Sequence, residues 1–143
     1  DYDFEIGKAI KLKEGKDISI ICAGSIVAEC VKASEILEKN GISCKVINMH
    51  TIKPIDKNMI LEASKTKLIF TVEEHNVIGG LGSAVAECTT QLKQSPRQIF
   101  IGIKDHYDKG GEYNFLKEKH GLSAEKIVEN VQLNYNNHDL KQK

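Results

Sequence analysis

Two glutamates and a histidine stand together in the middle of the chain. They are Glu73, Glu74 and His75. These residues could form a general acid/base set, because histidine is the side chain that titrates near neutral pH. No candidate nucleophile accompanies them in the sequence, so a second interpretation stays open, in which Glu73 ends a strand and the next two residues contact another surface.

A glycine-rich turn follows these residues and leads into an apolar helical pattern. Its candidate site residues are Gly79, Gly80, Gly82 and Ser83. Glycine allows the backbone to approach a neighbour closely, and the N-terminus of a helix favours an anion. The spacing is neither that of a P-loop nor that of the dinucleotide fingerprint. The turn is therefore either an anion site or a tight turn packed against another domain or subunit.

A second strand-to-helix turn, at Gly24 and Ser25, is a smaller candidate of the same kind. It follows the apolar run 18–23. Ser25 is of the residue type that caps a helix N-terminus, and such a turn can also cradle a phosphate. We expect the cap, and keep the phosphate as the alternative.

Short apolar runs alternate with helical patterns along the chain. Strands are expected at 18–23, 42–48, 67–73 and 98–103, after an extended segment at 6–12. Helices are expected at 25–40, 56–65, from 81 onward, 112–119 and 124–134. This alternation implies a mostly parallel sheet with helices on both faces. The sequence thus predicts a three-layer α/β domain of roughly five strands at 1–135 and a frayed tail at 136–143.

Several residues mark where the expected helices begin and end. Asp56 and Ser123 are good N-caps, and Gly41 and Gly121 suit the position just after a helix C-terminus. These positions give the predicted elements their boundaries.

Composition argues against several classes of protein. The 143 residues include 20 Lys+Arg and 20 Asp+Glu, so no bulk charge attracts nucleic acid or an anionic membrane. No apolar run approaches the roughly 20 residues of a membrane span. The four cysteines lack the close-set pairs of structural zinc, which predicts no metal site and reduced thiols in a cytoplasmic protein. Because the chain does not begin with Met, we expect a fragment, a processed subunit or an excised domain.

Five segments, in order, resemble the C-terminal domain of transketolase-like thiamine diphosphate enzymes. They are residues 4–9, 14–25, 46–56, 73–85 and 119–128. The most specific match runs from the Glu-Glu-His triplet through Gly-Gly-Leu-Gly-Ser-Ala-Val. The Thr-Ile-Lys-Pro at 51–54 looks most like transketolase, especially forms split into two subunits, and deoxyxylulose phosphate synthase is the close alternative.

The resemblance implies a role in assembly. In this family thiamine diphosphate lies between a pyrophosphate-binding and a pyrimidine-binding domain, and the third domain packs against both and helps form a dimer. No catalytic, cofactor-binding or metal residue of the family maps onto this chain. Thiamine diphosphate and Mg²⁺ would therefore belong to the parent enzyme, and the candidate residues named above would form a domain or subunit contact.

The parent reaction implied by the resemblance is transfer of a two-carbon ketol unit between sugar phosphates, as in the pentose phosphate pathway. The chain is about one domain long, so alone it is expected to be inactive. The expected partners are the cofactor-binding domains or subunit, within a homodimer. An alternative of another class is a free-standing module that binds a nucleotide or phosphometabolite at 24–25 or 79–83.

Overall fold

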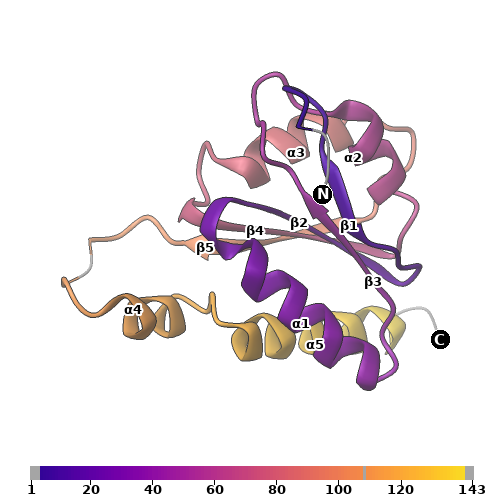
Figure 1. Ribbon diagram of the computed structural model, residues 1–143. Helices are drawn as coiled ribbons and strands as arrows, with labels where there is room; N and C mark the ends of the chain where they lie inside the picture. Colours follow the sequence, from indigo (N-terminus) through magenta and orange to yellow (C-terminus); the bar gives the residue numbers. More distant parts are fainter. Residues whose placement is uncertain (1–3, 108, 141–143) are drawn as a thin grey trace.

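The computed structural model describes residues 4–107 and 109–140, and these form one sheet with helices on both faces (Figure 1). The strands are β1 (Ile10–Lys13), β2 (Ile18–Ala23), β3 (Cys44–Asn48), β4 (Leu68–Asn76) and β5 (Arg97–Ile103). The helices are α1 (Val27–Lys39), α2 (Lys57–Ala63), α3 (Leu81–Thr89), α4 (Tyr113–Lys119) and α5 (Ala124–Leu140), and a 3₁₀ turn, η1 (Gly24–Ile26), precedes α1. The strand order is β1-β3-β2-β4-β5, with β1 antiparallel and the others parallel. The predicted α/β class and mostly parallel sheet are confirmed.

Two apolar cores lie on opposite faces of the sheet, because successive side chains of a strand point to opposite faces. In β4, Phe70 and Val72 join the core beneath α1 and α5. Ile69 lies between Leu68 and Phe70 in the sequence, so its side chain points to the opposite face and joins the core beneath α2 and α3. A strand covered on both faces is apolar at nearly every position, which explains why the central strands read as continuous apolar runs.

The first strand is shorter than the sequence predicted and begins later. Residues 6–7 form a turn, and Gly7 has a φ of +83°, in the left-handed region. The backbone N–H of Lys8 closes this turn by donating to the carbonyl of Glu5 at 3.1 Å. The expected extended segment at 6–12 is therefore corrected to Ile10–Lys13, which forms an antiparallel edge on β3.

Strand β4 is longer than the predicted run 67–73. Its last residue, Asn76, pairs with Ile103 of β5, and the Val77 N–H donates to the Ile103 carbonyl at 3.0 Å. Glu74 and His75 therefore belong to the strand rather than to a loop. Pairing with β5 keeps this polar segment extended, and that pairing comes from residues distant in the sequence.

Most of the predicted helix boundaries are confirmed. The Asp56 carboxylate accepts the Met59 N–H at 3.0 Å and caps α2. Gly41 and Gly121 have φ values of +82° and +72°, as expected just after a helix. Ser123 accepts the Lys126 N–H at 3.4 Å at the start of α5.

Two helix boundaries differ from the prediction. Ser25 lies within η1 and makes no cap, because its hydroxyl donates to Glu74 instead. Helix α5 continues past the expected end at Asn134 to Leu140. In the part of the chain that the structure describes, no helix is long and apolar enough to cross a membrane.

Glu29 of α1 joins three elements on one face of the sheet. Its carboxylate forms ion pairs with Lys117 of α4 at 3.0 Å and with Lys32 at 3.3 Å. It also accepts the Ala124 N–H at 3.0 Å at the start of α5. Burial raises the pKa of this carboxyl, but the hydrogen bonds from Lys117, Ala124 and Lys32 outweigh burial, so the net pKa is lowered from 4.5.

Glu29→Gln is therefore expected to lower the free energy of unfolding by about 1–2 kcal/mol at neutral pH. A carboxyl whose folded pKa is depressed stabilises the protein above its unfolded pKa, and this contribution is lost as the pH falls through the folded value. The difference in unfolding free energy between the wild type and Glu29→Gln is thus expected to shrink as the pH falls below 4.5. Urea denaturation from pH 7 to pH 3 measures it. Glu35→Gln, at an exposed position of the same helix, is the control. An equal loss of unfolding free energy in Glu29→Gln and Glu35→Gln would contradict the role assigned to Glu29.

Candidate functional site

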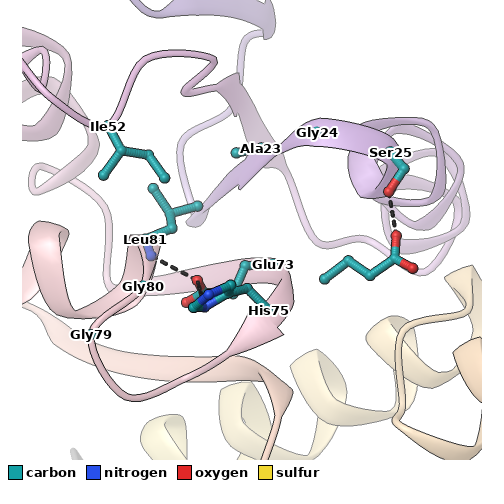
Figure 2. Close-up of a pocket in the computed structure, with 10 residues that line it drawn as sticks. Ala23, Gly24, Ser25, Ile52, Glu73, His75, Gly79, Gly80 and Leu81 are labelled. Carbon is teal, nitrogen blue, oxygen red and sulfur yellow. Dashed lines mark hydrogen bonds and ion pairs between the residues drawn. The ribbon is translucent and has the colours of Figure 1, made fainter.

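The candidate residues surround a hollow of about 380 Å³ where strands β2 and β4 end (Figure 2). Its lining comes from the β2–α1 turn, the end of β4, the glycine-rich turn and the segment after β3. The lining residues are Ala23, Gly24, Ser25, Ile52, Glu73, Glu74, His75, Gly79, Gly80 and Leu81. The carboxyl ends of parallel strands are where α/β folds carry ligands or contacts. The structure thus brings both predicted turns to one place.

The Glu-Glu-His triplet does not act as one group, because it continues a strand. Alternation places Glu73 on the face of α2 and α3, and Glu74 on the face of α1 and α4. Figure 2 shows the hydrogen bond between Glu73 and Leu81. The Glu74 carboxylate is bonded elsewhere, to the Ser25 hydroxyl. Neighbours in the sequence are therefore separated by the sheet itself.

Glu73 is the buried carboxylate of the site. Its side chain is 5% exposed. One oxygen accepts the N–H of Leu81 at 2.7 Å and the other accepts the N–H of Gly82 at 2.9 Å. These amides belong to the first turn of α3, where a negative charge is favoured by the helix dipole. The anion expected at this helix N-terminus is thus supplied by the chain itself.

The glycines of the turn allow this arrangement by close approach. A Cβ on Gly80 would lie 1.9 Å from a Glu73 oxygen, and a Cβ on Gly82 would lie 2.3 Å from the Phe100 ring. Gly79 has a φ of +79°. The Gly79 N–H donates to the Ser83 hydroxyl at 2.9 Å, and this hydroxyl donates to the Val77 carbonyl at 3.3 Å. The turn is therefore fixed by internal contacts.

Glu74 joins the turn before α1 to α4 on the other face of the sheet. It accepts hydrogen bonds from the Ser25 hydroxyl and, at 3.0 Å, from the Tyr113 hydroxyl of α4. Ser25 is thus a partner of Glu74 in the structure. Tyr113 was not predicted as a site residue, and only its position after the last strand could have suggested it.

His75 lies at the surface, with its side chain 66% exposed. Its Nδ1 donates to the Asn76 carbonyl at 2.8 Å and lies 3.9 Å from the nearer Glu73 oxygen. Both Glu73 oxygens are already held by backbone amides, so this pair is poorly arranged for proton transfer. The geometry favours a structural turn with an exposed histidine beside it.

Four exposed apolar side chains, which the sequence analysis missed, come from the N-terminal segment and from the loops after β3 and β4. Of these, Ile52 lines the hollow. Phe4, Ile6, Ile52 and Ile78 are 63%, 69%, 42% and 67% exposed. The Phe4 ring packs on the His50 ring at a centroid distance of 4.5 Å. We call these four residues the carboxyl-edge patch. The signal that could have revealed it was the isoleucines at 52 and 78, which stand in loops.

Comparison with known proteins agrees with the resemblance in the sequence. The family model "Transketolase, C-terminal domain" matches residues 7–127. The chain is 43% identical over 127 residues to the 6-deoxy-6-sulfo-D-fructose transketolase subunit SqwH of Clostridium sp. (strain MSTE9), which covers 88% of this chain and 39% of that protein. It is 34% identical over 133 residues to the 1-deoxy-D-xylulose-5-phosphate synthase of Caldanaerobacter subterraneus subsp. tengcongensis, covering 92% of this chain and 21% of the synthase.

A solved structure described as "Split gene transketolase, inactive beta4 tetramer" superimposes with a TM-score of 0.83 at 39% identity. The match covers 92% of this chain and 42% of that chain. The chain thus spans about two fifths of the length of the split-type relatives it matches. The family model covers most of the sequence, and the chain belongs to the transketolase C-terminal domain family.

Proposed function

We propose that this chain is the C-terminal domain of a thiamine diphosphate-dependent transketolase of the split type, and that it packs the cofactor-binding domains into an active homodimer. The parent enzyme would transfer a two-carbon ketol unit between sugar phosphates, in the cytoplasm and in pentose phosphate metabolism. The domain would be inactive alone. The similarity to a split-gene transketolase and to a sulfosugar transketolase subunit supports this proposal.

The carboxyl-edge patch carries the proposal. Ile78 precedes the glycine-rich turn, and Ile52 lines the same hollow as Gly79 and Leu81. Large apolar side chains that stay exposed beside a rigid turn are typical of a protein contact. Burial of one such isoleucine contributes about 1.5–3 kcal/mol, which is enough to matter in an interface. Glu73, Glu74, His75, Gly24, Ser25 and the turn at 79–83 would form the polar part of this contact.

The residues at this edge do not fit a bound diphosphate. Glu73 already occupies the amides of α3 that could hold a phosphate, and Glu74 adds a second carboxylate beside Ser25. Two carboxylates at one edge repel a polyanion. This domain would accordingly supply no ligand of thiamine diphosphate or Mg²⁺ here, and those groups would be held by the partner domains or subunit.

Ile78→Asp tests the contact in the intact protein that carries this domain, together with its cofactor-binding subunit where that is a separate chain. A charge at an otherwise apolar contact is expected to weaken assembly about ten-fold or more, since burying a charge is unfavourable. Assembly is measured by analytical ultracentrifugation, and ketol transfer from a ketose phosphate, or from 6-deoxy-6-sulfo-D-fructose, to an aldose phosphate is measured in parallel.

The control is Leu61→Asp on α2, where the leucine is 47% exposed and lies outside the patch. This variant is expected to assemble like the wild type. Unchanged assembly and activity of Ile78→Asp would reject the proposed contact. Melting of the intact variants, followed by circular dichroism, verifies that each still folds.

A second candidate function is that of a 1-deoxy-D-xylulose-5-phosphate synthase, because a protein of that name is 34% identical over 92% of this chain. The same intact protein is therefore assayed for the synthase reaction. Synthase activity without ketol transfer would select the second candidate.

A further inference from the structure

We propose that the free edge of β5 pairs, in antiparallel orientation, with the same strand of a second copy of this chain. β5 is the last strand on its side of the sheet, and among residues 4–107 and 109–140 no other strand pairs with its outer side. A strand edge of this kind can be extended by a further strand through main-chain hydrogen bonds. This contact is separate from the carboxyl-edge patch and does not depend on the proposed transketolase function.

Alternate residues of β5 direct their main-chain groups away from the sheet. The Ile103 carbonyl accepts the Val77 N–H at 3.0 Å, so the main-chain groups of Ile103 face β4. Successive residues of a strand present their N–H and C=O groups to opposite sides. Gln98, Phe100 and Gly102 therefore direct these groups outward, where no described residue is bonded to them. They are the groups to which an added strand would bond.

The two edges of the sheet differ in their protection against such pairing. At the other edge, β1 carries Lys11 and Lys13, and its pairing with β3 is irregular between them. Lysines and irregularities on an edge strand hinder the addition of another strand. β5 has its one charged residue, Arg97, at its first position, and only glutamine, glycine and apolar residues follow. The β5 edge is therefore left open, whereas the β1 edge is protected.

Apolar side chains flank the β5 edge on both faces of the sheet. Phe100 is 41% exposed, and a Cβ on Gly82 would lie 2.3 Å from its ring, which places the ring on the α3 face. On the opposite face, Leu133 of α5 is 64% exposed and lines a hollow of about 320 Å³ together with residues 100–102. Since successive side chains point to opposite faces, a hollow shared by three consecutive residues lies at the edge of the strand. An added strand would thus cover Phe100 on one face and Leu133 on the other.

The edge is complementary to a second copy of itself. With Phe100 opposite the same residue of the second copy, Gln98 lies opposite Gly102 of that copy, and each outward N–H meets an outward C=O. The charged Arg97 would face the apolar Ile103 of the second copy, so no like charges lie opposite each other. The two Phe100 rings would be neighbours on the α3 face, and aromatic pairs across two strands stabilise a sheet. This two-fold symmetry favours a second copy over an unrelated extended peptide.

A cysteine at position 100 tests the register directly. In the intact protein, the two Cα atoms at this position are expected to lie about 5.5 Å apart, which a disulfide can span. With copper phenanthroline in air as the oxidant, Phe100→Cys is expected to give a covalent pair of chains on non-reducing electrophoresis, and dithiothreitol is expected to reverse it. The native cysteines are buried or half-buried, so the wild type is expected to stay unlinked. Leu12→Cys, on β1, is the matched control, because Leu12 is 40% exposed at the other edge. A covalent yield from Phe100→Cys no higher than that from Leu12→Cys would overturn the proposal.

Hydrogen exchange of single amides in the intact protein separates a lost contact from a loosened strand. Phe100→Lys places like charges opposite each other on the two-fold axis, which opposes pairing. The outward amides of residues 100 and 102 are expected to exchange about ten-fold faster or more in this variant, whereas the inward amides of Ile99 and Ile101 keep their rates. Leu12→Lys is expected to change neither set. Equal acceleration of both sets, or unchanged exchange of the outward amides, would contradict the pairing.

Discussion

Replacing Glu73 by glutamine is expected to lower the free energy of unfolding by about 2–3 kcal/mol at neutral pH. Glutamine keeps the shape of the side chain, but one oxygen becomes an NH₂ group that faces the N–H of Leu81 or Gly82. One buried donor then loses its acceptor, and the negative charge at the start of α3 is lost as well. Urea denaturation of the two proteins, followed by circular dichroism, measures the difference.

The neighbouring glutamate provides the control for this experiment. Glu74 is exposed and bonded to two hydroxyl groups, so Glu74→Gln keeps an acceptor for both. Its expected cost is below about 1 kcal/mol, as for other exposed polar substitutions. Equal losses in the two variants would contradict the role assigned to Glu73.

Gly80→Ala is expected to cost about 2 kcal/mol or more, although it adds one methyl group in a turn. The new Cβ would lie 1.9 Å from a Glu73 oxygen and 2.9 Å from the Asn76 carbonyl oxygen. The buried carboxylate must then move away from the amides of α3. Gly110→Ala is the matched control, because its Cβ would meet no atom within 4 Å. Thermal and urea unfolding give both values.

A double-mutant cycle shows whether the two effects share one cause. Glu73→Ala removes the carboxylate, so the methyl group of Gly80→Ala no longer clashes with a Glu73 oxygen. The losses are then expected to be less than additive, with a coupling of about 1–2 kcal/mol. Strictly additive losses would mean that the glycine is required for another reason.

The layers of the fold could be predicted because their signals are local. The run Ile18–Ala23 is apolar and β-branched, as a strand buried on both faces requires. Asp56 caps a helix, and Gly41 follows one, through contacts within a few residues. Such features are visible in one stretch of sequence.

The end of β4 could not be predicted, because it depends on a distant strand. Glu74 and His75 are polar and precede a glycine-rich turn, which is typical of a loop, yet pairing of Asn76 with Ile103 extends the strand through them. Ser25 was assigned to a helix cap by its type, but a partner nearly fifty residues away holds its hydroxyl.

The two predicted turns line one hollow in the structure, but the hydrogen bonds within it could not be foreseen. An acid/base set of three adjacent residues, one of the two interpretations left open by the sequence, would require their side chains to lie together. Strand alternation separates Glu73 from Glu74, and Glu73 binds the backbone amides of α3.

The contact between Glu73 and Gly80 bears on how this motif evolves. Glycine is required at position 80 by a carboxylate of the same chain, so selection for folding alone retains both residues. Among related sequences, a glutamate at position 73 is therefore expected to occur with a glycine at position 80, and a change at one position to accompany a change at the other. A copy of the domain that has lost its partner would still keep the pair, whereas Ile52 and Ile78 would be free to become polar. Divergence at the isoleucines, with the glutamate and glycine unchanged, marks a domain that has become independent.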